Sequence, residues 1–162
     1  MSLIGAVSGI AAMLLVGPVI MLGPWFKTPP RPDTAEPGVV ERALAEISAS
    51  AGSDWFIEVV IESDSVRAAQ ADGGIDKWYF WEGLGQVRVS ELSSSSVGDQ
   101  PFRPSDVQFA GFARAWAAGL PEGQKIRVQR EMTQRGMDGP VSIELTRGGP
   151  DGETLNPDFT RK

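Results

Sequence analysis

Carboxylates are the side chains of this sequence that could do chemistry, because the 162-residue chain contains neither histidine nor cysteine. Without histidine there is no common general base, no Ser–His nucleophile and no usual ligand for zinc or copper. Without cysteine there is no disulfide and no thiolate metal site. An enzyme would therefore have to use Asp, Glu, Lys, Arg, Tyr79 or Ser. Of these, the acids are the plausible catalysts, as a pair of the kind used in glycoside hydrolysis.

Glu58 and Glu62 form a candidate acid pair, since both lie on one face of a predicted strand. At ~3.3 Å per residue their side chains lie about 13 Å apart, which exceeds the ~5–9.5 Å separation that a glycosidase needs. Asp64 and Asp72 fall in predicted turns, where aspartate bonds to its own backbone. The sequence therefore predicts a protein that is not an enzyme and has no catalytic residue.

The sequence also contains no good match to a metal-binding or a phosphate-binding loop. The stretches 72–76 and 151–153 combine acids with glycine, but neither has the D-x-[DN]-x-[DN]-G framework with a distal glutamate. Hairpin turns use the same residues. The stretch 148–150 is Gly-Gly-Pro, and no Lys-Ser/Thr or predicted helix follows it, which excludes a phosphate loop. We expect no metal and no cofactor.

The run at 3–26 carries no formal charge, and the rest of the chain would be attached to it. An apolar run of roughly 20 residues is long enough to cross a bilayer as a helix. The run lacks the basic start and small-residue cleavage site of a signal peptide, and it lacks the polar face of a buried amphipathic helix. We therefore expect a single-pass transmembrane helix at 1–26.

This predicted helix carries residues typical of helix packing and of a membrane interface. Small residues at a spacing of four let two helices approach closely in lipid, although glycine is also simply frequent in such helices. The expected helix-packing residues are Gly5, Gly9, Met13 and Gly17. Residues expected at the membrane interface are Trp25, Phe26 and Lys27. The predicted partners are therefore membrane lipid and an integral membrane protein complex.

Beyond this run, the alternation of turn residues with periodic apolar segments predicts an α+β fold. The expected order is a Pro-rich extended linker at 27–36, a helix-plus-antiparallel-meander unit at 37–91, a Ser-rich connector at 92–103 and a second such unit at 104–162. The first helix should begin after Pro37 and end at Gly52. Its strands are expected at 55–62, 66–71, 75–81 and 86–91. The second unit should have a helix within 105–116 and strands at 126–134, 141–147 and 155–160.

Four consecutive aromatic residues are the most unusual feature of these units. They are Trp78, Tyr79, Phe80 and Trp81 in the third predicted strand. Alternation sends Tyr79 and Trp81 to one face of the sheet and the other two to the opposite face. One pair should pack beneath the helices, while the second is either packed as well or exposed. All four are a candidate contact surface.

The repeated helix–meander order and the run DKWYFWEG at 76–83 resemble the tandem PepSY-like extracytoplasmic domains of membrane-anchored bacterial proteins. The resemblance covers most of 37–162, with Trp78 and Phe80 at positions where tyrosines are expected. It implies an outward-facing interaction fold without ligand and without a catalytic residue.

The charge of the chain bears on its partners and on the side of the membrane on which its domain lies. The chain has a net charge of −6, so it lacks the basic footprint of a protein that binds nucleic acid. Lys27 and Arg31 after the apolar run favour a cytoplasmic domain by the positive-inside rule. The PepSY-like resemblance implies the extracytoplasmic side, and we follow it.

These patterns lead to two hypotheses for function. The first is a non-enzymatic, single-pass accessory or structural subunit of a larger membrane complex, for example a respiratory or transport assembly. The alternative is a free-standing cell-envelope module that binds a peptide, a lipid or a wall fragment in the groove between its sheet and its helices.

Overall fold

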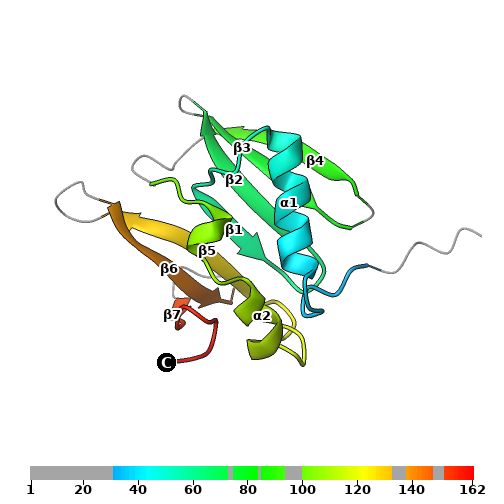
Figure 1. Cartoon of the computed structure of the whole chain (residues 1–162), viewed down its shortest axis with the longest axis vertical. Helices are drawn as coiled ribbons and strands as arrows, with labels where there is room; N and C mark the ends of the chain where they lie inside the picture. Colours follow the sequence, from blue (N-terminus) through cyan, green and yellow to red (C-terminus); the bar gives the residue numbers. More distant parts are fainter. Residues whose placement is uncertain (1–30, 73–74, 84, 94–99, 133–137, 148–151) are drawn as a thin grey trace, which may run out of the picture.

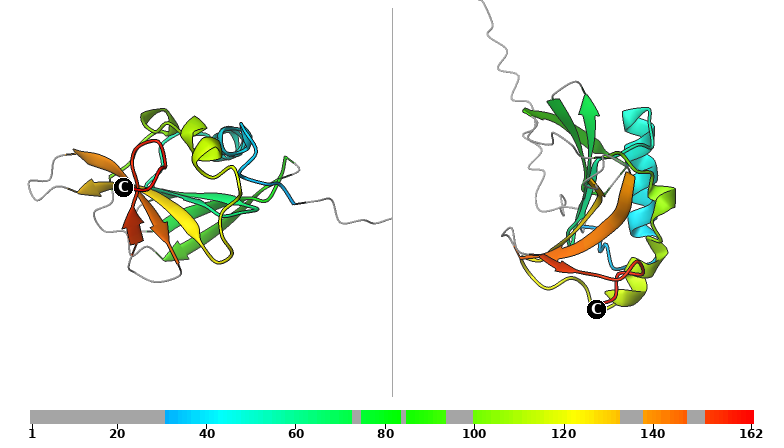
Figure 2. Two further views of the ribbon diagram at one scale, coloured as in Figure 1. Left: turned by 90° about the horizontal axis from the view of Figure 1, so that it is seen from below. Right: turned by 90° about the vertical axis from the view of Figure 1, so that its left-hand side faces the viewer.

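One antiparallel sheet with helices on a single face makes up the part of the chain that is described (Figures 1 and 2). The computed structural model describes residues 31–162 except 73–74, 84, 94–99, 133–137 and 148–151. The strand order across the sheet is β4-β3-β2-β1-β5-β6-β7. The elements in chain order are α1 (Val39–Ala51), β1 (Glu58–Ile61), β2 (Val66–Asp72), β3 (Ile75–Trp81), β4 (Val87–Ser93), the 3₁₀ helix η1 (Pro104–Asp106), α2 (Ala110–Ala115), β5 (Lys125–Met132), β6 (Asp138–Thr146) and β7 (Gly152–Thr154).

Helix α1 is bounded by two glycines. It follows Gly38 at φ 81° and ends at Gly52, whose φ is 68° and whose backbone N–H donates to the carbonyl of Ser48. This ending is common because glycine adopts the left-handed conformation without a steric penalty. The buried residues recur at helical spacing along one side: Val39, Val40, Ala43, Leu44 and Ile47. The first predicted helix is therefore confirmed.

Strand β1 joins the two halves of the chain, because it pairs on both of its edges. Its four residues pair antiparallel with β2 on one side and with β5 on the other. In the middle of this contact, Val59 lies opposite Ala68 and opposite Val128. The predicted arrangement, a transmembrane helix plus two helix–meander units, is therefore wrong: both meanders are parts of one seven-stranded sheet within the described residues.

The hydrophobic core lies between the sheet and the helical face and draws on both halves of the chain. Val59, Trp81 and Val128 reach it from the sheet, and Leu44 reaches it from α1. Phe159 near the C-terminus is fully buried in the same cluster. The two halves consequently share one core.

The transmembrane part of the predicted fold class also needs correction. Within the described ranges, no helix has the length and apolarity needed to cross a membrane. Helix α1 has 13 residues and α2 has 6, which correspond to about 20 Å and 9 Å at 1.5 Å per residue, short of the ~30 Å of a bilayer core. The predicted helix at 1–26, with its packing and interface residues, lies outside the described residues.

The chain just before α1 packs onto the domain. Thr34, which is 1% exposed, donates its hydroxyl to the carbonyl of Glu62 at 2.6 Å and its backbone N–H to the carbonyl of Ser63 at 3.1 Å. Arg31 pairs with Asp64, and this hydrogen bond raises the pKa of the arginine. Residues 31–36, which belong to the predicted extended linker, therefore lie against the turn between β1 and β2.

The C-terminal residues form a tight turn where a strand was predicted at 155–160. Asp158 Oδ1 accepts hydrogen bonds from the backbone N–H and the hydroxyl of Thr160, at 3.2 Å and 2.7 Å, and these bonds lower the pKa of Asp158. Between them, Phe159 has a φ of 67°, which a residue with a side chain rarely adopts. Its ring lies 5.7 Å from the rings of Phe109 and Phe112. Burial of the Phe159 ring in the core therefore stabilises the turn despite its unusual backbone conformation.

Candidate functional site

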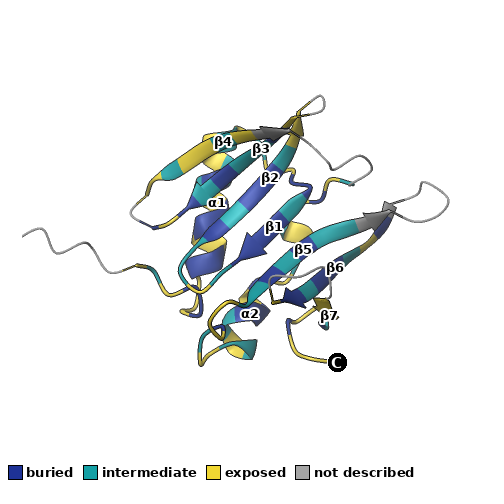
Figure 3. Ribbon diagram, turned by 180° about the vertical axis from the view of Figure 1, so that it is seen from behind, coloured by how far each residue is buried: buried dark blue, intermediate teal, exposed yellow. Residues whose placement is uncertain are grey.

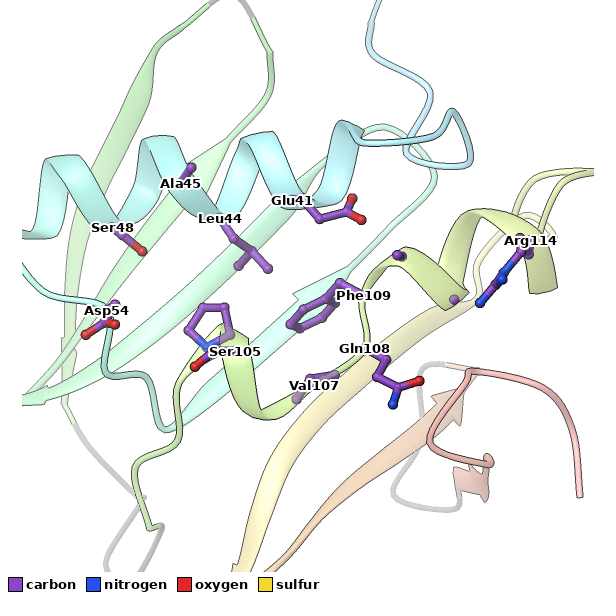
Figure 4. Close-up of a pocket in the computed structure, with 13 residues that line it drawn as sticks. Glu41, Leu44, Ala45, Ser48, Asp54, Ser105, Val107, Gln108, Phe109 and Arg114 are labelled. Carbon is purple, nitrogen blue, oxygen red and sulfur yellow. The ribbon is translucent and has the colours of Figure 1, made fainter.

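A pocket of about 550 Å³ lies between α1 and the chain segment that runs from η1 into α2 (Figure 4). Its volume falls within the ~300–1,000 Å³ range of small-molecule pockets. We call it the helix groove. Its lining residues are Glu41, Leu44, Ala45, Ser48, Asp54, Pro104, Ser105, Val107, Gln108, Phe109, Ala110, Gly111 and Arg114.

One wall of the helix groove is a single stripe of α1. Glu41, Leu44, Ala45 and Ser48 are spaced by three or four residues, so they lie above one another on the same side of the helix. Leu44 points down toward the groove floor, whereas Ala45 is exposed. The regular helix therefore sets the spacing of this wall.

The opposite wall is held by local hydrogen bonds in the segment around η1. The Asp106 carboxylate accepts from the backbone N–H of Arg103 at 3.1 Å and from Nη2 of Arg130 on β5 at 2.9 Å. The N–H of Val107 donates to the carbonyl of Pro104. These bonds fix the segment to the sheet, so the groove wall does not depend on α2 alone.

Phe109 completes the floor at the start of α2. It is 4% exposed, and in Figure 4 its ring lies across from Leu44, which is 2% exposed. The ring also contacts that of Phe159, so the C-terminal turn supports the floor from below. The floor is thus apolar and anchored in the core.

Charged groups stand at both ends of this apolar floor. Glu41 on α1 and Arg114 on α2 lie toward one end, and Asp54 lies toward the other (Figure 4). Asp54 is 3.7 Å from Nε of Arg103. Glu41 and Arg114 are both exposed, and neither forms a hydrogen bond or a salt bridge with another described residue. The groove therefore presents one negative and one positive side chain that are available to a ligand.

The helix groove offers an apolar floor and charged groups that a ligand could contact. The groove combines an apolar floor with the exposed and oppositely charged Glu41 and Arg114, and its carboxylates Glu41 and Asp54 come from separate elements. In the described part of the chain, no group of three or more acidic side chains is placed to hold a metal ion. The acids considered for chemistry are already paired, because Glu58 lies 2.8 Å from Arg127 and Glu62 lies 3.2 Å from Arg67.

The four aromatic residues of β3 divide between the two faces of the sheet, as alternation requires. Tyr79 and Trp81 are buried in the core, where the indole N–H of Trp81 donates to a carboxylate oxygen of Glu46 on α1. Trp78 and Phe80 are half-buried and by alternation lie on the face away from the helices, the side of the sheet that Figure 3 turns toward the viewer, with ring centroids 6.4 Å apart. Tyr79 and Trp81 consequently cannot reach a partner on the surface.

Two arginines cover the half-buried pair. The guanidinium of Arg67 lies 5.6 Å from the ring of Trp78, and that of Arg88 lies 4.6 Å from the ring of Phe80. Such stacking is favourable because the ring face is electron-rich. It also shields the rings from a ligand, so this face is a weaker candidate for binding than the helix groove.

The helix groove residues were not singled out from the sequence as a site. The sequence signal was limited to the helical stripe of α1 and to the predicted placement of Phe109 on an apolar helix face. What brings the two together is the pairing of β1 with β5, which places the 104–114 segment beside α1.

Comparison of the chain with protein families, with curated proteins and with solved structures finds no match in any of the three. The PepSY-like resemblance and the extracytoplasmic location stay predictions from the sequence.

Proposed function

We propose that this protein is a non-enzymatic binding module whose helix groove takes an extended peptide segment of a partner protein. The observation that carries the proposal is the apolar floor of Leu44 and Phe109 beside the exposed charges of Glu41 and Arg114, neither of which forms a hydrogen bond or a salt bridge with another described residue. An apolar site with a few convergent polar groups is the usual form of a binding pocket.

The chemistry of the groove favours a peptide over a lipid or a wall fragment. A peptide can supply an apolar side chain for the floor, a basic side chain for Glu41 and a carboxylate for Arg114 within a few residues. A lipid acyl chain could fill the apolar floor, but it has no group that pairs with Glu41 or Arg114. A neutral sugar would leave the apolar floor without an apolar group to contact.

A selection from a displayed library of random peptides on the purified chain tests this function. We expect the selected sequences to share an apolar residue with a basic and an acidic neighbour. Ala45→Trp should weaken their binding by about tenfold or more, because the indole would fill the groove from its wall on α1. Fluorescence anisotropy of one labelled selected peptide measures the effect.

The matched control is Ala49→Trp. Ala49 is also an exposed alanine of α1, one turn further along, and it does not line the groove. This variant should bind the peptide as the wild type does. The proposal fails if the library yields no enriched sequence, or if the two tryptophan variants bind the selected peptide equally well.

A further inference from the structure

The outer edge of β4 is a feature that the helix groove does not use. β4 pairs with β3 over seven successive positions, from Trp81 opposite Val87 to Ile75 opposite Ser93. In the described part of the chain, no strand pairs with its other side. A strand edge presents backbone N–H and C=O groups that can pair with another strand.

This edge carries two charged residues, Arg88 and Glu91, but it lacks other features that prevent pairing. The strand reads VRVSELS, without the proline or lysine that commonly protect an edge, and its register with β3 is continuous. The opposite edge of the sheet is broken, because β7 has only three residues and pairs with only three of the nine residues of β6, and the chain then turns back through the bridge between Leu155 and Arg161. Of the two sheet edges that the structure describes, β4 therefore offers the longer edge.

Val89 makes the edge apolar on the helix side of the sheet. It is 49% exposed, although its direct neighbour Tyr79 is 6% exposed in the core. Tyr79 and Val89 thus form an apolar row that runs from the core to the edge of the sheet. A further strand placed against β4 would bury Val89 and extend this row.

We propose that β4 pairs antiparallel with β4 of a second copy of this chain, which gives a twofold-symmetric dimer with one sheet continuous across both copies. Symmetric pairing centred on Val89 places this residue opposite itself and Arg88 opposite Ser90. No like charges then lie directly opposite each other, and such an opposition would be unfavourable.

The charges on β4 and the presence of a single long edge also favour a second copy of the chain as the partner. β4 contains one basic and one acidic residue, Arg88 and Glu91, so the negative charge of the chain is not concentrated at the contact. A twofold contact uses the same surface on both copies and is closed. Because the long edge is consumed by this contact, assembly stops at two copies.

Sedimentation equilibrium of the full chain tests the dimer. The expected wild-type mass at high concentration is twice 17.4 kDa, with a dissociation constant below about 1 mM. Val89→Lys should raise this constant at least about tenfold, because two ammonium groups would meet at the symmetry axis. Circular dichroism checks that the variant remains folded.

The matched control is Ile75→Lys. Ile75 is 46% exposed and lies on the same face, but on β3 inside the sheet. This change should leave the dimer intact. A mixture of Val89→Lys and Val89→Glu chains should restore pairing, because opposite charges would then meet at the axis. A monomeric wild type, a dimer that Val89→Lys does not weaken, or a mixture that stays monomeric would each overturn the proposal.

Discussion

Gly111 shows how one residue allows the C-terminal turn to hold the helix groove. A Cβ atom at this position would lie 2.8 Å from the backbone carbonyl oxygen of Asp158, closer than real Cβ contacts. The turn carries Phe159, whose ring supports Phe109 on the floor of the groove. The absent side chain at Gly111 therefore permits the close approach on which the floor depends.

Gly111→Ala should lower the free energy of unfolding by ~1–3 kcal/mol, since the new methyl group overpacks against backbone that cannot turn away. The direction of the change in unfolding free energy is informative, because alanine in a helix is otherwise ~1 kcal/mol more favourable than glycine. Urea denaturation followed by circular dichroism measures the change. A stabilised variant would show that the turn does not pack against α2 in this way.

At the scale of the element, β3 separates core from surface along a single strand. Trp81 is 1% exposed and is hydrogen-bonded to Glu46, whereas Trp78 is half-buried beneath the guanidinium of Arg67. The two tryptophans have the same chemistry and differ only in the face that they occupy.

Trp81→Ala should therefore cost ~3–5 kcal/mol of unfolding free energy, as expected for removal of a core aromatic residue. Trp78→Ala should cost ~1 kcal/mol, mainly the lost stacking with arginine. Urea denaturation of the two variants under identical conditions gives the comparison. Equal costs would contradict the assignment of faces.

At the scale of the whole molecule, the pairing of β1 with β5 makes the two halves of the chain one folding unit. Val59 and Val128 lie directly opposite each other in this contact, and both are fully buried. Each half alone would expose one side of the shared core. Small single domains with one core usually unfold in one cooperative transition.

Val59→Ala and Val128→Ala should each destabilise the same single transition, by ~1–3 kcal/mol, because each removes buried methyl groups. Circular dichroism and tryptophan fluorescence should report coincident urea midpoints for the wild type and for both variants. Two separate transitions, one sensitive to each substitution, would instead indicate two independent units.

The helix groove illustrates why a site can escape sequence reasoning. The stripe from Glu41 to Ser48 and the apolar face at Phe109 are visible as local periodicity. Their meeting depends on contacts between segments more than 50 residues apart, since Leu44 and Phe109 come from different halves of the chain. Periodicity describes which side of an element is apolar, but it does not name the element that covers that side.

The sequence by itself determined the helix that ends at Gly52, most of the strands and the alternation of aromatic residues in β3, because glycine conformation and side-chain periodicity are local properties. Only the tertiary structure decided that both meanders form one sheet, that 155–160 is a turn and that the 31–36 segment packs on the domain. These features depend on strand edges and buried contacts between distant residues, and the free energy of such contacts is absent from any local pattern.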